Sequence, residues 1–475
     1  MSVSPSTDLR SRIDAGDLHF LDGLVLLGTI ASQRWFAGKS RDVLDARVLD
    51  AAVAPGGPPI LAFAIVEVRY GLQSHDLYHL PLGFRPAEEG WHEAVIAETA
   101  GWTIYDAISD PALVRELVGL MRSNTALRLD HAGMTFWGAE SLADRARELS
   151  VIRPMGSEQS NSSIVLDEVL ALKLYRRIEP GLNPELEILR FLTERGFEHV
   201  AALEGFAAYE GPPLDTTLGI LQRFVPSHGD GWKLALDTIS SDPSWMPEHA
   251  HRLGEVTALL HNALGSDAAD PHFAPEEPSS ESLALLSASI DEEIEQVFMT
   301  LPSSGALAPI SGRGEEVRDR LRLLTHIGNV GKVIRTHGDY HLGQALWTAE
   351  ADWLILDFEG EPARSVPERR RKRSPLRDVA GMLRSFAYAA SASQLQRGVH
   401  PPSDWEERCR SRFLEGYVAT ADPALLPGGE QGIERLLMVF ELEKAVYELR
   451  YELDNRPDWV GIPVAGIQRM LETES

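Results

Sequence analysis

The chain has 475 residues, 44% hydrophobic and 24% charged, and its 71 acidic side chains against 45 basic ones give a formal net charge of −26. Such an excess of acid argues against general binding to nucleic acids or to anionic membranes, because a polyanion is repelled at long range. The single cysteine, Cys409, excludes a disulfide framework and a cysteine-based zinc site, and the lack of a signal-peptide core or of an apolar run of about 18 residues predicts a soluble, cytoplasmic protein.

The first part of the chain, residues 1–98, is predicted to be a β-rich domain. Apolar runs such as DARVLDAAVA and ILAFAIVEVRYGL alternate there with turn residues, including a PGGPP break. A helix is predicted next for PALVRELVGLMRS, at 111–123, with Pro111 at its first turn.

The middle of the chain combines strands with one helix. Two β-type runs, 162–166 and 169–175, flank an Asp-Glu pair and predict a hairpin, and a loop rich in Gly, Ser and Asn precedes them. The segment NPELEILRFLTERG is predicted to form a helix, with Asn183 as its N-cap and Gly196 just past its end.

The last part of the chain is predicted to be helical from about residue 245. One β-type interruption, at 335–362, contains the strand-like runs ALWT and WLILDF. The order of elements predicts an α+β protein in three parts, residues 1–98, 99–226 and 227–475.

Three polar residues of this interruption are expected to meet at one end of its hairpin. Asp339 lies in a His-Gly-Asp segment, Gln344 directly precedes the first strand, and Asp357 ends the second. Paired antiparallel strands bring these positions together. Two carboxylates and an amide oxygen suit Mg²⁺ and leave one acid to orient a hydroxyl, as phosphoryl transfer requires.

A second set of residues in the middle part fits a nucleotide. Lys173 lies on the second strand of the predicted 162–175 hairpin, and Glu187 lies on the helix that follows, where a carboxylate can hold a strand lysine against phosphates. Glu185, on the same first turn, is the alternative partner. The loop 156–162 offers backbone N–H groups and hydroxyl donors to an anion.

The segment HGDYHLGQ resembles the catalytic segment of protein kinases and aminoglycoside phosphotransferases, with Gln344 in place of the usual asparagine. More specifically, the chain resembles the maltokinase family, which forms maltose 1-phosphate. The motifs that carry this resemblance, spread from residue 33 to about 463, are QRWFAGKSR, EQSNSS, HGDYHLGQ, DFEGEP, SPLRDVAGMLRSF and ELEKAVYELRYE.

The resemblance implies a bilobal protein-kinase-like fold, similar to that of aminoglycoside phosphotransferases, with a β-rich cap at 1–98, an ATP-binding lobe with a hinge at 99–226 and a helical sugar-binding lobe at 227–475. It implies Asp339 as the catalytic base. The residues that it implies for Mg²⁺ are Gln344, Asp357 and Glu359. The residues that it implies for ATP are Lys173, Glu187, Ser157, Gln159, Ser160, Asn161, Gln222 and Phe224, the last two in the hinge LQRFV.

The family assigns the sugar to the late helix, where Lys444, Tyr447 and Tyr451 match, and His341 is the further residue expected at the sugar. Positions i, i+3 and i+7 share one helix face, so the spacing independently places the cation and the two phenols together. The implied partners are ATP and maltose, without nucleic acid or membrane, in a monomer or a homodimer. The implied reaction feeds α-glucan and glycogen synthesis.

Three other functions remain open. The acceptor could be another small molecule, an amino sugar such as glucosamine or an aminoglycoside. The chain could also be a nucleotide-binding pseudokinase that scaffolds a partner. His337 and His341 flank Asp339 and could indicate a metal-dependent hydrolase, with His249, His251 and His261 as further ligands. That third interpretation is disfavoured because it leaves Lys173 and Glu187 unexplained.

A basic run, residues 369–373, follows the predicted hairpin. Such a run can mark a nucleic-acid or localisation signal. In a chain of this net charge we interpret it as a solvated loop, with a minor role near anions left open.

Overall fold

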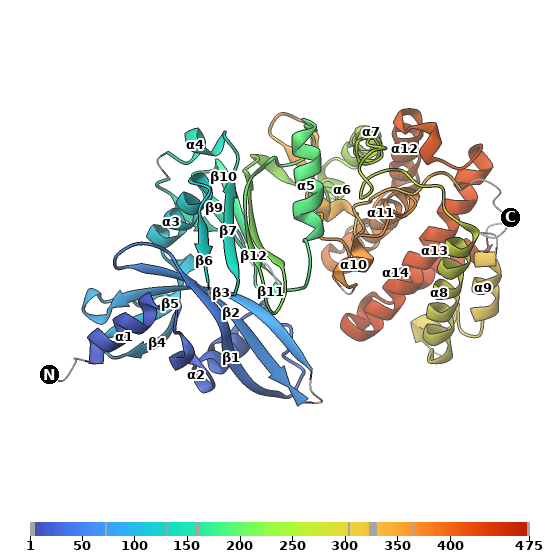
Figure 1. The fold of residues 1–475 in the computed structure, drawn as a ribbon. Coiled ribbons are helices and arrows are strands. Elements are labelled where there is room, and N and C mark those ends of the chain that lie inside the picture. Colours follow the sequence, from blue (N-terminus) through green and yellow to red (C-terminus); the bar gives the residue numbers. More distant parts are fainter. Residues whose placement is uncertain are drawn as a thin grey trace. The chain divides into compact units, whose positions relative to one another are not determined.

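The computed structural model describes residues 5–71, 74–129, 131–147, 149–156, 161–302, 305–322, 330–362 and 364–472. The chain divides into two compact units (Figure 1). The first comprises Met1–Arg190 and Ala201–Val225, and the second Phe191–Val200 and Pro226–Ser475.

The first sheet of the first unit is antiparallel, in the order β1-β2-β3-β5-β4, and the short β11 pairs with β3. Its strands are β1 (Val43–Val53), β2 (Ile60–Tyr70), β3 (His75–Pro86), β4 (Val95–Thr99), β5 (Trp102–Asp106) and β11 (Arg177–Ile178). Helices α1 (Pro5–Asp14) and α2 (Leu24–Ser32) contribute apolar side chains to its core. Because β4 and β5 pair with each other, this sheet continues beyond residue 98.

The second sheet of this unit has the order β6-β7-β12-β13-β10-β9-β8. Its strands are β6 (Ala126–Arg128), β7 (Gly133–Gly138), β8 (Ile152–Pro154), β9 (Asn161–Leu166), β10 (Leu170–Tyr175), β12 (Leu203–Glu210) and β13 (Thr216–Arg223). The predicted β9–β10 hairpin is present, and its turn residues Asp167 and Glu168 have φ of 50° and 55°. Positive φ at both central residues is typical of the type I′ turn, whose twist matches that of the strands.

Three helices accompany the second sheet. The predicted helix at Pro111 is α3 (Pro111–Arg122), which Asp110 caps by accepting from Ala112 N. It packs on β7 and β12, and the short α4 (Leu142–Arg145) follows β7. The other predicted helix is α5 (Pro184–Glu194), where Asn183 Oδ1 accepts from Glu185 N at 2.8 Å, as expected of an N-cap.

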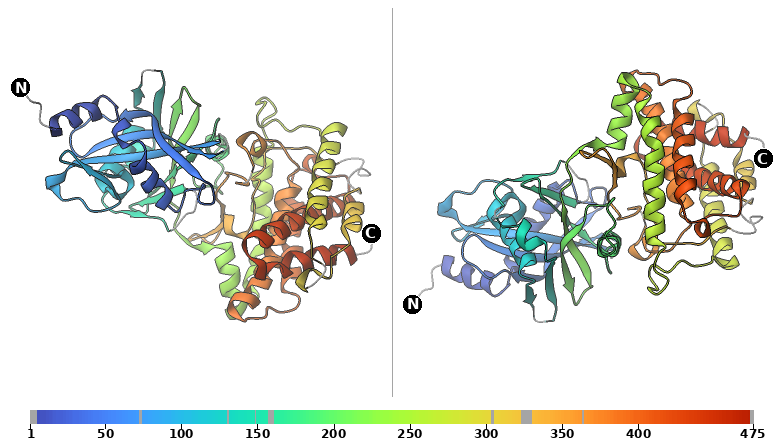
Figure 2. Two further views of the ribbon diagram at one scale, coloured as in Figure 1. Left: turned by 90° about the horizontal axis from the view of Figure 1, so that it is seen from below. Right: turned by 90° about the horizontal axis from the view of Figure 1, so that it is seen from above.

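The second unit is mainly helical (Figure 2). Its helices are α6 (Gly231–Ser241), α7 (Trp245–Leu264), α8 (Ser280–Met299), α9 (Gly314–Arg322), α10 (Val366–Arg369), α11 (Leu376–Arg397), α12 (Trp405–Thr420), α13 (Glu430–Asn455) and α14 (Gly461–Glu472). Its small sheet has the order β14-β15-β16, with strands β14 (Ser227–Asp230), β15 (Ala345–Thr348) and β16 (Trp353–Ile355). The predicted hairpin in the helical part is therefore present as β15–β16.

Helices α7 and α12 pack against each other at two glycines. A Cβ on Gly254 of α7 would collide with the carbonyl oxygen of Phe413, and one on Gly416 of α12 with that of His251. Glycine at these positions thus allows α7, which contacts the β15–β16 hairpin, to lie close against α12. In the part of the chain that the structure describes, no helix combines the length and the apolar character that crossing a bilayer requires.

We predict that His79 on β3 makes the first unit sensitive to acid. Its side chain is buried, and burial together with the charge of Arg176 lowers its pKa to about 3. The unfolded chain would take up a proton near the ordinary pKa of about 6.5, so stability is full above that pH and falls as the pH drops towards the folded pKa.

The substitution His79→Phe should remove this contribution, because a buried phenyl ring does not titrate. Thermal unfolding of both proteins, measured from about pH 7.5 to about pH 5, should show a smaller loss of Tm in the variant. An equal loss in the two proteins would contradict the prediction.

Candidate active site

A buried carboxylate, Asp378 on α11, holds the segment that carries Asp339. The Asp378 carboxylate accepts from the backbone N–H of His337 at 2.7 Å and of Gly338 at 3.0 Å. Gly338 has φ of +86°, a conformation that favours glycine. The backbone leading into Asp339 is thus fixed by two charge-assisted hydrogen bonds.

Asp378 is itself supported from α7. Its side chain is 3% exposed and lies 3.2 Å from Nε2 of His261, whose Nδ1 lies 2.9 Å from the hydroxyl of Tyr417. Burial would raise the pKa of Asp378, but the hydrogen bond and charge of His261 and the N–H of Gly338 hold it below its usual range. The carboxylate therefore stays ionised inside the helical unit.

The sequence analysis did not single out Asp378, although it lies within the quoted motif SPLRDVAGMLRSF. The sequence pattern that could have indicated Asp378 is an acidic residue among the apolar residues of a helix, here next to the buried Leu376, Val379 and Leu383. Such an acid must be paired or hydrogen-bonded, which indicates a structural or functional partner.

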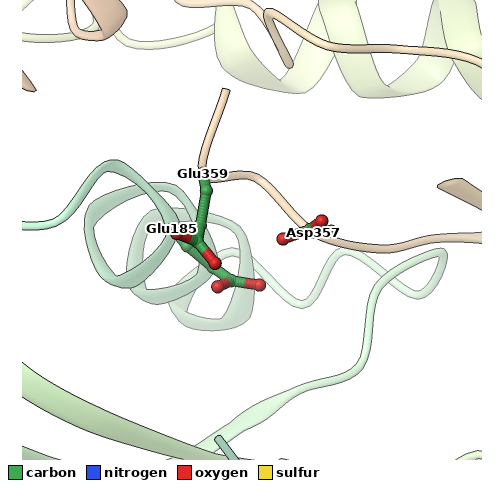
Figure 3. A group of neighbouring side chains, drawn as sticks. All are labelled: Glu185, Asp357 and Glu359. Atoms are coloured by element: carbon green, nitrogen blue, oxygen red, sulfur yellow. The ribbon is translucent and has the colours of Figure 1, made fainter. Parts of the chain in front are cut away.

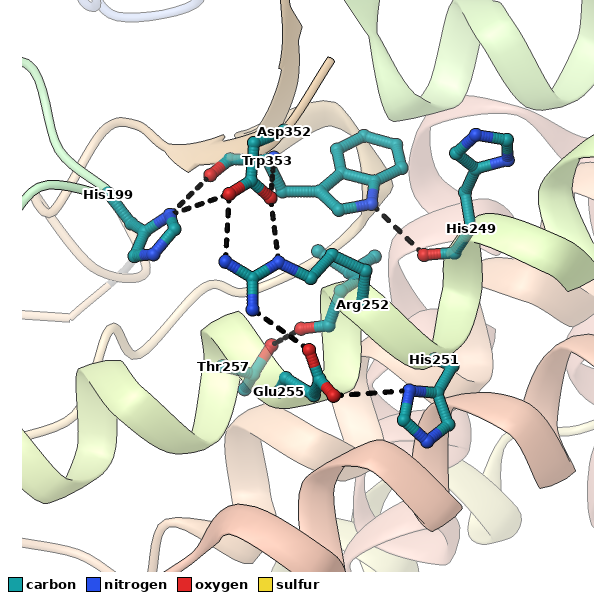
Figure 4. A network of polar contacts seen from close by, with 9 residues as sticks. His199, His249, His251, Arg252, Glu255, Thr257, Asp352 and Trp353 are labelled. Atoms are coloured by element: carbon teal, nitrogen blue, oxygen red, sulfur yellow. Dashed lines mark hydrogen bonds and ion pairs between the residues drawn. The ribbon is translucent and has the colours of Figure 1, made fainter. Parts of the chain in front are cut away.

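The β15–β16 hairpin is tied to α7 at its turn (Figure 4). The guanidinium of Arg252 donates to both carboxylate oxygens of Asp352, at 2.9 and 2.8 Å. Next to it, the indole N–H of Trp353 donates to the carbonyl of His249 at 3.1 Å, and the backbone carbonyl of Trp353 lies 2.9 Å from Nδ1 of His199. Because the Arg252–Asp352 pair is bidentate, it fixes the orientation of the hairpin turn as well as its position.

The base of the hairpin brings two of the predicted residues together. The side-chain N–H of Gln344 donates to Asp357 at 3.2 Å, and the N–H of Leu356 donates to the carbonyl of Gln344 at 2.9 Å. Asp357 has φ of 61°. Non-glycine residues in this region carry backbone strain and are found disproportionately at functional sites.

The chemistry of the donor set fits the magnesium ion that the resemblance implies. Asp357 and Glu359 both project from the segment after β16 (Figure 3). With the amide oxygen of Gln344 they offer hard oxygen ligands, which Mg²⁺ prefers. Arg369 donates to the backbone carbonyl of Glu359 at 3.2 Å and so helps to fix this segment.

Asp339 lies beside Lys444 of α13. The ammonium of Lys444 is 3.4 Å from Oδ1 of Asp339, and both side chains are partly exposed. Burial would lower the pKa of Lys444, but the carboxylates of Asp339, Glu361 and Glu448 raise it above its ordinary value. Lys444 therefore carries its charge at neutral pH, and its ammonium faces the Asp339 carboxylate.

A pocket next to Asp339 is lined by Gly338, Tyr340, Glu361, Lys444 and Tyr447, among others. Burial and the neighbouring Glu361 raise the pKa of Tyr447 to about 12, so its hydroxyl is protonated and can donate a hydrogen bond. The structure thus brings Lys444 and Tyr447 together with Asp339, as the helix spacing predicts.

The other two residues expected at the sugar lie differently. Tyr451 is 44% exposed, is not among the residues that line this pocket, and has Arg456 over its ring at 5.3 Å. His341 accepts from the N–H of Gly343 through Nδ1 at 3.0 Å. Burial lowers the pKa of His341, which leaves the ring neutral at pH 7.

In the first unit, Lys173 on β10 forms an ion pair with Glu185 on α5, at 2.8 Å (Figure 3 labels Glu185). The hydroxyl of Tyr175 donates to the same carboxylate at 2.8 Å. A strand lysine and a carboxylate on the next helix thus lie together, and Glu185, the alternative residue of the first turn, contacts Lys173. Glu187 is also buried, one position beyond Leu186 on that turn.

The remaining residues expected at ATP lie in the loop and in the hinge. Ser157, Gln159 and Ser160 lie outside the described residues, and Asn161 begins β9 with a buried side chain. In the hinge, the N–H of Phe224 donates to the carbonyl of Val169 at 2.8 Å. The side chain of Gln222 donates to the carbonyl of Ala201 at 3.4 Å.

The histidines weighed for a metal-dependent hydrolase have structural partners. His249 stacks on Trp245 with ring centroids 4.2 Å apart, and His251 lies 3.4 Å from Glu255. His337 donates through Nε2 to the carbonyl of Leu356 at 2.8 Å, and His261 forms a hydrogen bond with Asp378 through its own Nε2. These contacts account for the histidines without a metal ion.

The part of the chain that forms most of the first sheet matches a known domain family. Residues 30–110 match the family model of the maltokinase N-terminal cap domain. Two curated relatives are glucosamine kinases. The one from Streptacidiphilus jiangxiensis is 23% identical over 329 residues, 66% of this chain and 72% of the relative, and the one from Mycolicibacterium smegmatis is 24% identical over 331 residues, 67% and 79% of the two chains.

Solved structures of glucosamine kinase have the same fold. One, crystal form B, aligns with a TM-score of 0.70 at 19% identity, over 94% of this chain and 99% of that one. Another, a complex with glucosamine, ADP and inorganic phosphate, aligns with a TM-score of 0.68 at 19% identity, over 94% and 98%.

The protein therefore has a kinase-like fold that carries a maltokinase-type N-terminal cap domain, as the resemblance implied. The comparisons support the coarser class predicted from the sequence, a phosphotransferase of the sugar-kinase type.

We predict that Asp378→Asn impairs phosphotransfer through the position of Asp339. Asparagine has one acceptor oxygen and no charge, so it cannot hold both N–H groups and His261. A displaced Asp339 should lower kcat by about 100-fold, the scale expected of a misplaced catalytic group, with KM for ATP nearly unchanged.

Steady-state kinetics of the folded variant would check this, with Asp404→Asn, an exposed substitution on the same unit, as the control. Thermal unfolding would establish that the variant is folded at the assay temperature. A folded Asp378→Asn protein with the kcat of the control would contradict the assigned role.

Proposed function

We propose that the protein is an ATP-dependent maltokinase. It would transfer the γ-phosphoryl group of ATP to the anomeric C1 hydroxyl of maltose, giving maltose 1-phosphate and ADP for α-glucan and glycogen synthesis. The observation that carries the proposal is the anchored Asp339 segment, which presents a carboxylate beside Lys444 and the pocket that Tyr447 lines.

Asp339 is the residue that would orient the C1 hydroxyl and take up its proton. Its carboxylate lies 3.4 Å from the ammonium of Lys444, and a carboxylate in hydrogen-bond reach of a hydroxyl can act as its general base. Lys444 also supplies positive charge next to the hydroxyl that attacks the phosphoryl group. The two residues thus combine a base with local electrostatic stabilisation.

Lys173 would bind the phosphates of ATP, held in place by Glu185. Gln344, Asp357 and Glu359 would hold Mg²⁺, which would supply positive charge to neutralise the phosphates. The strongly acidic chain would otherwise repel ATP, so binding of ATP is expected to depend on these cations.

The charges around the pocket favour a neutral acceptor. Glu361 pairs with Arg364, Glu443 pairs with Arg377 at 2.6 Å, and Glu293 pairs with Arg450 at 3.2 Å. A carboxylate that already has a cationic partner is a poor partner for the ammonium of an amino sugar, and Lys444 would repel that ammonium. Hydroxyl groups and the faces of a neutral sugar suit Tyr447 instead.

A second candidate is glucosamine kinase, because the curated relatives carry that name. The acceptor can be identified by coupled measurement of ADP formation with Mg·ATP and maltose, glucosamine or glucose. Maltose should give the highest kcat/KM, and a higher value for glucosamine would replace our proposal with the second candidate.

The same assay tests the base. Asp339→Asn should lower kcat with maltose by about 10³-fold, within the range for loss of a general base. Lys233→Gln, a substitution of an exposed lysine on α6, is the control and should behave like the wild type. Near-normal turnover by a folded Asp339→Asn variant would contradict the mechanism and favour a different base.

Tyr447→Ala should raise KM for maltose about tenfold while KM for ATP changes little, because one aromatic contact and one hydrogen bond to the sugar are lost. Tyr447→Phe should show only part of this effect. Tyr451→Ala, predicted from the helix spacing to act in the same direction, should act more weakly because its ring is exposed. Equal increases in KM for maltose and for ATP would place the sugar elsewhere.

A further inference from the structure

A second cavity of the helical unit has no role in the proposed reaction. Its volume is about 710 Å³, and it lies between α8, the segment 370–374 and the face of α13 that carries Leu436 and Phe440. The basic run singled out in the sequence thus lines a cavity rather than a solvated loop alone. The volume is that of a small-molecule site, for which about 300–1,000 Å³ is typical.

The lining of this cavity is cationic although the chain is strongly acidic. Seven arginine and lysine residues line it against four glutamates. Three of these glutamates already have partners: Glu276 pairs with Lys372, Glu443 pairs with Arg377, and Glu368 accepts from the N–H of Ser365 at 3.0 Å. With seven cationic side chains against four carboxylates, the lining carries a net positive formal charge, which favours an anion.

Some polar groups of the residues that line this cavity lack hydrogen-bond partners. In the described part of the chain, the buried Oγ of Ser374 and the buried Nη1 of Arg377 have no hydrogen-bond partner, and the side chain of Ser374 is 9% exposed. Arg373 lines the same cavity and forms no ion pair among the described residues. Leaving such groups unsatisfied is unfavourable unless a ligand completes them.

Arg373 is also held rigidly. Its backbone exchanges two hydrogen bonds with Ile334, at 2.8 and 3.0 Å. Burial and the neighbouring charges of Arg377 and Arg364 lower its pKa to about 10. With the backbone of Arg373 held in place, its guanidinium lies near like charges and would be stabilised by an anion.

We propose that this cavity binds a phosphomonoester anion, with its phosphate on Arg373, Arg377 and Ser374. Guanidinium groups match phosphate oxygens in bidentate geometry, and a serine hydroxyl adds a further donor. The opposite wall, with Leu286, Leu436 and Phe440, would take an uncharged body attached to the phosphate. The source of the anion is an organic phosphate such as a sugar phosphate, or inorganic phosphate itself.

This inference does not depend on the identity of the acceptor. Arg373 and Arg377 also line the pocket beside Asp339, so a substitution of either could act there instead. Ser289 of α8 lines only the larger of the two cavities and is exposed. The substitution Ser289→Trp therefore fills the proposed site without touching the residues assigned to catalysis.

Isothermal titration calorimetry of the full chain tests the proposal, with inorganic phosphate and glucose 1-phosphate as probes. Saturating Mg²⁺ and a non-hydrolysable ATP analogue would be present throughout, to exclude binding at the nucleotide phosphates. The proteins are the wild type, Arg373→Gln, Ser289→Trp and the control Arg408→Gln, which removes an exposed charge on α12.

We expect saturable binding of at least one probe to the wild type and to Arg408→Gln, and binding at least about tenfold weaker in Arg373→Gln and Ser289→Trp. Tighter binding of glucose 1-phosphate assigns the site to an organic phosphomonoester, whereas equal or weaker binding assigns it to inorganic phosphate. The proposal is overturned if the wild type binds neither probe, if Ser289→Trp binds normally, or if Arg408→Gln loses as much as Arg373→Gln.

Discussion

The geometry of the site depends on one buried carboxylate. Asp378 replaces the water that the N–H groups of His337 and Gly338 would otherwise need, and these are the two residues before Asp339. An ionised carboxylate in a helical core requires such donors, and His261 completes them. These hydrogen bonds offset the cost of burying the charge. They also fix the backbone conformation of the two residues before Asp339. These contacts join α11 to α7, and the Arg252–Asp352 pair joins α7 to the β15–β16 hairpin, so the three elements form one framework.

The remaining acids of the site follow a related rule, in which each is placed next to a specific cation or donor. Lys444 forms an ion pair with Asp339, and Lys173 forms one with Glu185. Gln344 donates a hydrogen bond to Asp357. In a protein of charge −26, these contacts balance negative charge locally at the site. The larger cavity lined by Arg373 extends this pattern to a second part of the helical unit.

Much of the local structure could be predicted from the sequence, and the tertiary partners could not. Turn chemistry, N-caps and strand alternation are short-range signals, so the β9–β10 and β15–β16 hairpins and the helix after Asn183 were predictable. The ion pair of Lys173 with Glu185 could not be specified from the sequence, because Glu185 and Glu187 occupy the same helical turn. Asp378 is far from Asp339 in sequence, so its hydrogen bonds to the Asp339 segment depend on tertiary packing. The exposure of Tyr451 likewise depends on which residues pack against the last turns of α13.

The central claim is that this framework directs a phosphoryl group to the anomeric hydroxyl of a neutral disaccharide. The most direct measurement is ³¹P NMR of the product formed by the wild-type protein from maltose and Mg·ATP. The account predicts one new sugar-phosphate signal, split by coupling to the anomeric proton of the reducing glucose unit. A signal coupled to the protons at C6, or the release of inorganic phosphate alone, would contradict it.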